Sequence, residues 1–234
     1  MHLTAEQLSR LYGTIFGQVN EDDLARMERF IRRKGLDRRR RFLCAISALT
    51  VTDRPRQLRF MLMWAIGEGV GPEEIYEVIL QSYLFAGYPA AIEGLFAFRD
   101  VLHKEGIRLA TGENEYRVDK WRERGLELCR SVYGSNFDRL QQNMKALSPE
   151  LADWMILEGY GKVLGRNRLG PAERELCTVA ALTVLGRERQ LLSHIKGALN
   201  IGARKSELHE AILQTSLFSS LFFTLRGLRL LRQC

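Results

Sequence analysis

The sequence lacks the features of disulfide scaffolds, membrane proteins and secreted proteins. Its 234 residues include four cysteines, none in a C-x-x-C pair: Cys44, Cys129, Cys177 and Cys234. We therefore expect reduced thiols and a cytoplasmic protein. The charge-free stretch from Ala211 to Leu225 has 15 residues, fewer than the ~20 apolar residues that cross a membrane. The N-terminus has no basic region followed by an apolar one, so we expect no signal peptide.

Strand signals and prolines are also scarce. The sequence has no Asn-Gly or Asp-Gly hairpin turn, and four of its five prolines stand where a helix is expected to begin: Pro55, Pro72, Pro149 and Pro171. Proline suits the first turn of a helix because the N–H group that it lacks has no partner there. Apolar residues then recur every three or four positions. The sequence predicts an all-α protein with about a dozen helices, including a buried helix over 177–185.

Acidic residues nearly balance basic ones outside one short segment. The formal net charge is +7, but residues 32–41 (RRKGLDRRRR) alone carry seven basic groups and one acid, a net of +6. The other 224 residues therefore carry about +1. A solvated or subunit-facing turn is the simpler interpretation of this segment. Nucleic-acid binding is the alternative, but no recognisable nucleic-acid module or interleaved aromatic residues accompany the charge, so nucleic acid is not an expected partner.

An internal repeat is the strongest structural signal. A shift of 133 residues aligns 38–98 with 171–231 without a gap, and 22 of the 61 aligned pairs are identical. The chain therefore reads as a duplication with its join near 106–116. We call residues 1–110 copy 1 and residues 111–234 copy 2. Because each copy of a duplicated unit keeps the face that bound its twin, we expect the two to pack as an intramolecular pseudo-dimer.

The two copies differ where chemistry is expected. Glu175 of copy 2 aligns with Phe42 of copy 1, and His194 aligns with Met61. A carboxylate that orients an imidazole is a common basis of acid–base catalysis near neutral pH. A buried core histidine and a glutamate that compensates a helix dipole are the alternatives. Since copy 1 lacks both members together, we expect a coupled pair in copy 2 and a lost site in copy 1.

Several motifs resemble those of the carboxymuconolactone decarboxylase and alkylhydroperoxidase D-like family. They cover most of both copies: 35–43 (GLDRRRRFL), 74–77 (EIYE), 86–91 (AGYPAA), 174–176 (REL), 190–202 (QLLSHIKGALNIG) and 207–210 (ELHE). The resemblance implies a helical bundle that assembles through paired subunits, as trimers or hexamers. A fused double copy is then expected to form a homo-oligomer, a trimer of pseudo-dimers.

The resemblance also implies two chemistries. The peroxidase branch uses a C-x-x-C pair before the histidine, and Arg187 and Gln190 occupy those two positions here. Glu175 does stand at that branch's proton-relay position. Without the thiol pair, disulfide-based peroxide reduction has no mechanism. A relative of the peroxidases that has lost its redox pair remains an alternative, as does a non-catalytic binding or assembly protein.

The decarboxylase branch needs no cysteine and no cofactor. His194 would move the proton, and Glu175 would orient the imidazole ring of His194. The nearest cations in the sequence would hold the carboxylate of a small anionic substrate, such as a carboxylated lactone: Arg174, Arg187 and Lys196. The alternative for each cation is a solvated helix face. No metal is expected, because the other histidines show no ligand spacing with His194: His2, His103 and His209. The sequence thus predicts cofactor-free decarboxylation or proton transfer in copy 2.

Overall fold

The computed structural model describes residues 3–110 and 117–234, which contain helices and no strand. Copy 1 has six helices in that part of the chain: α1 (Ala5–Phe16), α2 (Glu21–Ile31), α3 (Arg38–Thr50), α4 (Pro55–Gly67), α5 (Pro72–Gln81) and α6 (Tyr83–Lys104). Copy 2 begins with α7 (Val118–Tyr133), α8 (Phe137–Leu147), α9 (Pro149–Trp154) and the π-helix η2 (Met155–Leu164). It continues with α10 (Pro171–Val184), α11 (Glu188–Asn200), α12 (Lys205–Leu213) and α13 (Leu221–Arg232). Short 3₁₀ turns are η1 (Gly134–Asn136) and η3 (Gln214–Leu217). The all-α prediction is confirmed.

The proline rule located four helix starts correctly. Pro55, Pro72, Pro149 and Pro171 are the first residues of α4, α5, α9 and α10. Three pairs of helices also begin 133 residues apart: α3 with α10, α4 with α11, and α5 with α12. The predicted buried helix is the second half of α10. The repeat in the sequence is therefore a repeat of helices.

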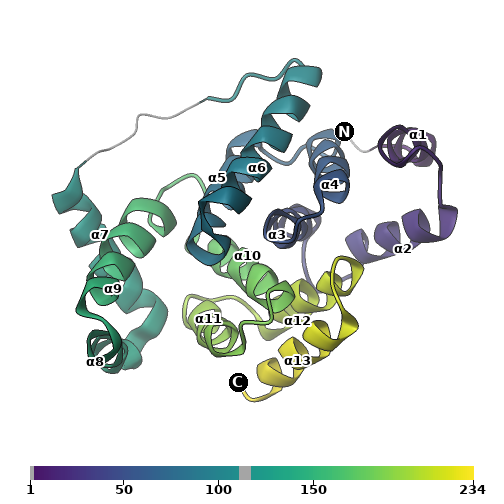
Figure 1. Cartoon of the computed structure of the whole chain (residues 1–234). Coiled ribbons are helices and arrows are strands. Elements are labelled where there is room, and N and C mark those ends of the chain that lie inside the picture. The colour runs from purple at the N-terminus through teal and green to yellow at the C-terminus, as the bar shows by residue number, and fades with distance from the viewer. Residues whose placement is uncertain (1–2, 111–116) are drawn as a thin grey trace.

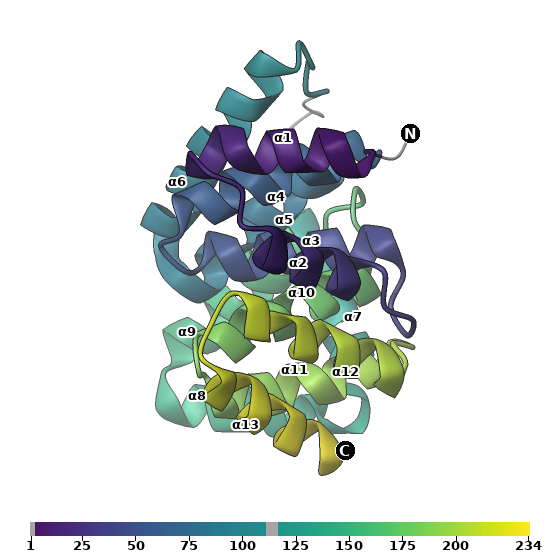
Figure 2. The same cartoon turned by 90° about the vertical axis from the view of Figure 1, so that its right-hand side faces the viewer.

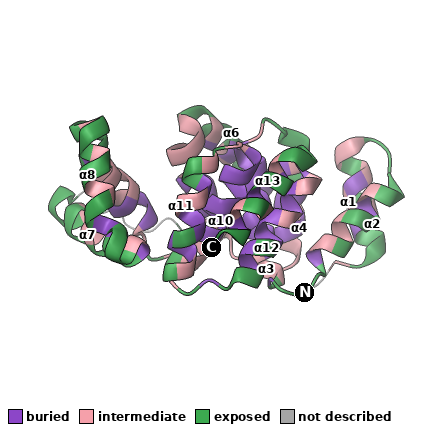
Figure 3. Ribbon diagram, turned by 90° about the horizontal axis from the view of Figure 1, so that it is seen from below, coloured by how far each residue is buried: buried purple, intermediate pink, exposed green. Residues whose placement is uncertain are grey.

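The two copies pack through α3 and α10, the equivalent helices of the pair. These helices are in direct contact at the centre of the molecule (Figure 1), and nearly all of their residues are buried. Seen from below, α1 and α2 flank this core at one end and α7 and α8 at the other (Figure 3). In the side view, α1 and α13 lie on opposite sides of α3 and α10 (Figure 2). The arrangement is the predicted intramolecular pseudo-dimer.

The predicted join lies between α6, which ends at Lys104, and α7, which begins at Val118. Residues 111–116 of the predicted join lie outside the described residues. The boundary between 110 and 111 stays a prediction.

Two matching ion-pair clusters connect the copies. Arg41 of copy 1 donates to Glu210 of copy 2 at 2.9 Å, and the equivalent Arg174 of copy 2 donates to Glu77 of copy 1 at 2.8 Å. Arg33 and Arg166, also equivalent, add a second arginine to each carboxylate. Arg41, Arg174, Glu77 and Glu210 are all buried. Each cluster therefore pairs charges that would be costly to bury alone.

The basic segment supplies much of this network. Besides Arg33 and Arg41, the segment's Arg40 donates to Glu173 and Glu207 of copy 2, while Arg38 and Arg39 pair with Glu68 and Glu74 of copy 1. The net charge of the segment is thus matched by carboxylates of both copies. Arg33, Arg40 and Arg41 therefore fit the subunit-facing interpretation of this segment, except that they face copy 2 of the same chain and not a second subunit.

Candidate functional site

Glu175 and His194 meet between α10 and α11. The Nδ1 atom of His194 lies 2.8 Å from the Oε2 atom of Glu175. Only 9% of His194 and 3% of Glu175 is exposed to solvent. The carboxylate therefore fixes the orientation of the ring and engages Nδ1, which leaves Nε2 as the nitrogen that is available to a bound molecule. The structure brings together the two residues that the sequence predicted as a pair.

His194 borders a cavity of about 330 Å³. Residues of α7, α8, α9, η2 and α11 form most of its wall, and copy 1 contributes Leu84 and Phe85 from the start of α6. Phe85 meets the His194 ring edge-on, with 5.6 Å between ring centres. The remaining lining residues are Tyr133, Met144, Leu151, Trp154, Met155, Glu158, Gly159, Tyr160 and Leu164. The cavity is therefore apolar apart from His194, Glu158 and two tyrosines, and both copies build it.

The two tyrosines form a hydrogen-bonded pair in the cavity wall. The Tyr160 hydroxyl donates to the Tyr133 oxygen at 3.1 Å, and Ser193 lies 3.5 Å from the same oxygen. Burial raises the pKa of Tyr133 and, more strongly, that of Tyr160. Both hydroxyls therefore stay protonated at neutral pH. Since the Tyr133 oxygen accepts from its neighbours, its own O–H group is the one that a bound molecule can use.

Close backbone packing places these tyrosines. A Cβ atom on Gly125 of α7 would lie 2.1 Å from the Ile156 carbonyl oxygen, and one on Gly161 of η2 would lie 2.0 Å from the Trp121 carbonyl oxygen. Only glycine allows α7 and η2 to approach this closely. Tyr133 and Tyr160 are not among the site residues that the sequence predicted. The available signal was the echo of 12–16 (YGTIF) in 133–137 (YGSNF), which marks Tyr133 as a retained position.

The three predicted substrate-binding cations lie in different places, and none lines the cavity as far as the structure describes it. The buried Arg174 guanidinium is engaged by Glu77, by the Gln81 side chain and by two backbone carbonyls. It serves the interface between the copies, because its side chain leaves α10 on a different side from that of Glu175. Lys196 is exposed two residues after His194, which is about 200° around the helix.

Arg187 is the one of the three that follows the helical period of His194. It is exposed at the N-terminal end of α11, seven residues before His194. Seven residues are close to two turns, so both residues lie on the same side of the helix.

Three of the four cysteines are buried, and burial disfavours the thiolate form of two of them. Cys44, Cys129 and Cys177 are buried, and only Cys234 is exposed. Burial, with a smaller contribution from the Glu175 charge, raises the pKa of Cys129 to about 12. Burial likewise raises the pKa of Cys177 well above its usual value. Because the thiolate is the nucleophile in peroxide reduction, these thiols do not replace the absent C-x-x-C pair.

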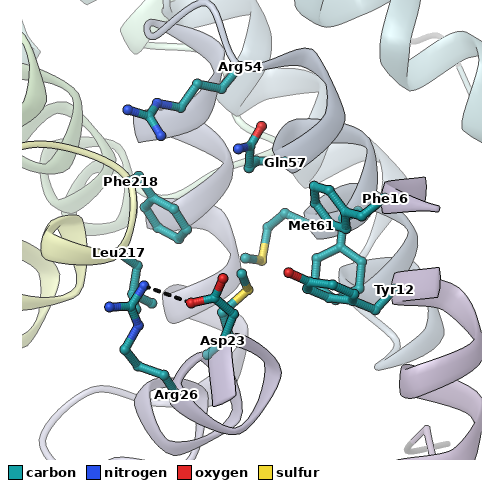
Figure 4. Close-up of a pocket in the computed structure, with 11 residues that line it drawn as sticks. Tyr12, Phe16, Asp23, Arg26, Arg54, Gln57, Met61, Leu217 and Phe218 are labelled. Atoms are coloured by element: carbon teal, nitrogen blue, oxygen red, sulfur yellow. Dashed lines mark hydrogen bonds and ion pairs between the residues drawn. The ribbon is translucent and has the colours of Figure 1, made fainter. Parts of the chain in front are cut away.

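The equivalent region of copy 1 has no acid–base pair. Phe42 and Met61 are fully buried, and Phe42 packs edge-on against Trp64 with 5.3 Å between ring centres. Met61 borders a smaller pocket, drawn in Figure 4.

The described residues contain no candidate metal site and no candidate membrane span. Within residues 3–110 and 117–234, no three His, Cys, Asp or Glu side chains are arranged to hold a metal ion. No helix in the same ranges combines the length and apolar character of a membrane span.

Comparison with known proteins supports the resemblance. "Peroxisomal protein 2" of Schizosaccharomyces pombe is 29% identical over 178 residues, which cover 73% of this chain and 81% of that protein. The 4-carboxymuconolactone decarboxylase of Acinetobacter baylyi is 34% identical over 98 residues, which cover 42% of this chain and 73% of that protein. "Peroxisomal protein 2" of Saccharomyces cerevisiae is 27% identical over 161 residues, 58% of this chain and 56% of that protein. Given the names of the two yeast relatives, a cytoplasmic location stays a prediction.

The sequence pattern of one family matches the chain twice, once in each copy. The matched residues are 22–100 and 149–220, and they include the Glu175–His194 pair in the second segment. The two matches correspond to the tandem repeat of helices described above. The chain belongs to the carboxymuconolactone decarboxylase family, in a tandem form.

Proposed function

We propose that copy 2 carries out cofactor-free acid–base chemistry on a small carboxylated substrate, with decarboxylation of a lactone as the reaction. The observation that carries this proposal is the 2.8 Å contact between Glu175 and a His194 that borders a cavity. The name of the Acinetobacter relative supplies the substrate to test, 4-carboxymuconolactone. His194 is the proton donor, and Glu175 positions it and compensates the charge of the protonated ring.

The reaction needs one proton transfer to carbon. The bond between the ring carbon and the carboxylate breaks, carbon dioxide leaves, and the electron pair stays on the carbon and delocalises onto the conjugated carbonyl. His194 Nε2 then gives its proton to that carbon and takes another from solvent. The neutral Tyr133 hydroxyl stabilises the oxygen that gains charge, as donors aimed at a developing oxyanion do.

Arg187 is the cation that this proposal assigns to the substrate carboxylate. It shares one side of α11 with His194, whereas Lys196 lies on another side and Arg174 is engaged by Glu77. Replacement of Arg187 by Gln is expected to raise KM about tenfold with little change in kcat, since hydrogen bonds to charged groups contribute about 1.5–3 kcal/mol. The neighbouring exposed Arg189→Gln is the matched control.

The proposed assembly is a homotrimer of pseudo-dimers. Exposed apolar side chains lie at equivalent positions of the two copies, Tyr88 and Ile92 on α6 and Leu221 and Leu225 on α13. Apolar surface of this kind is typical of contacts between subunits. Light scattering in solution is expected to give three times the chain mass of 26.9 kDa, and a mass of one chain would contradict the assembly.

Loss of 4-carboxymuconolactone and release of carbon dioxide by the purified protein test the reaction. His194→Asn is expected to reduce kcat by about 10²–10⁴, the usual contribution of a positioned acid or base. His103→Asn makes the same chemical change at a histidine on α6 outside the site and is expected to retain activity. Equal turnover by wild type and His194→Asn, or no turnover of this lactone by wild type, would overturn the proposal.

A further inference from the structure

Copy 1 has a pocket of its own at the place that corresponds to the copy 2 cavity. Its volume is about 190 Å³. Four of the lining positions of the two pockets correspond. Met61 takes the place of His194, Tyr12 that of Tyr133, and Leu217 and Phe218 of copy 2 close it as Leu84 and Phe85 of copy 1 close the other. Copy 1 therefore has a pocket although it lacks the acid–base pair.

The lining of the copy 1 pocket carries more positive charge than that of the copy 2 cavity. Arg54 and Gln57 lie on one side of the pocket, and Tyr12 and the Asp23–Arg26 ion pair lie on the other (Figure 4). Asp23 and Arg26 are 3.2 Å apart and compensate one another. Arg54 is exposed to solvent, and its side chain makes no hydrogen bond or ion pair with the part of the chain that the structure describes, so one cation is left for a ligand.

The rest of the pocket is apolar and small. Phe16, Phe60, Met61 and Phe218 line it, and the Tyr12 hydroxyl, whose pKa is raised by burial, stays a neutral donor. A dry cavity of about 150 Å³ takes up benzene, so a pocket of this size holds one ring with a small substituent. Arginine matches the geometry of a carboxylate.

We infer that copy 1 binds a small monoanion with an apolar body, an aromatic monocarboxylate in chemical class, and leaves it chemically unchanged. The Arg54 guanidinium holds the carboxylate, and the phenylalanines hold the ring. No acid–base chemistry follows, because Phe42 and Met61 stand where copy 2 has Glu175 and His194. This inference does not depend on the proposed reaction of copy 2.

Binding of benzoate, measured by isothermal titration calorimetry on the full chain, tests this inference. Wild type is expected to bind benzoate at least tenfold more tightly than benzyl alcohol, which has the same ring without the charge. Arg54→Gln is expected to weaken benzoate binding 10- to 100-fold, the fold-change that corresponds to a hydrogen bond to a charged group. Arg56→Gln, an exposed arginine on the same helix, is expected to leave the affinity unchanged.

A further variant distinguishes the two pockets. Arg187→Gln is expected to leave benzoate binding unchanged if benzoate occupies copy 1, and a loss in this variant with none in Arg54→Gln would place the ligand in copy 2 and overturn the inference. Equal affinity for benzoate and benzyl alcohol, or no heat of binding at millimolar benzoate, would overturn it as well.

Discussion

Copies 1 and 2 share the helices of the repeat and differ in the side chains that lie at their pockets. Three pairs of equivalent helices begin 133 residues apart, and one of these pairs, α3 and α10, meets at the centre of the molecule. Each copy also encloses a pocket that the other copy helps to line. Copy 2 places a carboxylate and an imidazole beside its pocket, while copy 1 has Phe42 and Met61 at those positions. Copy 1 therefore shows that the bundle can pack with apolar residues at both positions of the acid–base pair.

The interface between the copies shows a second kind of difference. Arg41 and Arg174 are equivalent, and so are Glu77 and Glu210, so their two ion-pair clusters repeat one another. Arg40 and Glu173 are equivalent as well, and they contact each other at 2.8 Å. Two identical subunits would place identical residues at that contact. Fusion into one chain allowed an arginine on one side and a glutamate on the other.

The largest expected effect comes from giving copy 2 the residues of copy 1. The double variant Glu175→Phe/His194→Met is expected to lose activity by about 10²–10⁴. Its melting temperature is expected to stay equal or rise, because apolar replacement of a buried charged pair is often neutral or stabilising by about 1–4 kcal/mol. Turnover assays and thermal unfolding of the same preparations check both expectations. Loss of stability together with activity would show that the pair also supports the fold.

The repeated ion-pair clusters predict equal damage from equivalent changes. Glu77→Gln and Glu210→Gln each leave a buried arginine without its carboxylate, and each is expected to lower the free energy of unfolding by about 3–5 kcal/mol. Urea unfolding of both variants measures the two values, with exposed Glu123→Gln as the control. If one variant lost less than about 1 kcal/mol of unfolding free energy and the other did not, the two clusters would not be energetically equivalent.

The pH dependence of stability tests one of these two ion-pair clusters. Arg33 and Arg41 lower the pKa of Glu210 from 4.5 to about 2, despite the opposing effect of its burial. Glu210 therefore contributes stability above pH 4.5 that is lost as the pH falls toward 2, amounting to about 3 kcal/mol for this shift. Unfolding measured from pH 6 to pH 2 is expected to show that loss in wild type. Glu210→Gln is expected to start from a lower stability and to fall less steeply; parallel curves would contradict this account.

The smallest effect is expected at the contact between equivalent residues. The Arg40 and Glu173 side chains are 26% and 14% exposed, so their coupling is partly screened by solvent. A double-mutant cycle of Arg40→Gln and Glu173→Gln is expected to give a coupling energy of about 1 kcal/mol. A coupling energy near zero would mean that Arg40 pairs equally well with Glu207 alone, and Glu173 with Arg39 alone.

Features that depend on residues close together in the sequence were predicted well. Proline fixes the geometry of a first helical turn wherever it stands, so four helix starts followed from four residues. The Glu175–His194 pair could be found because its two members lie on adjacent helices and change together between the copies. Arg174 was assigned to the substrate only because it is a cation next to Glu175 in the sequence, although copy 1 has the equivalent Arg41. The Arg174 side chain leaves the helix about 100° away from that of Glu175, toward Glu77, and only the packing of the two copies reveals that partner.

The cavity itself could not be predicted from the sequence. Phe85 comes from the other copy, and Tyr133 and Tyr160 reach the site because Gly125 and Gly161 let two backbones approach. The sequence by itself determined the helices, the duplication and the acid–base pair, because local backbone geometry and repeat identity are written along the chain. Only the tertiary structure decided which charges meet across the copies and which side chains enclose each pocket, because those contacts join residues that are distant in sequence and depend on the direction in which each side chain leaves its helix.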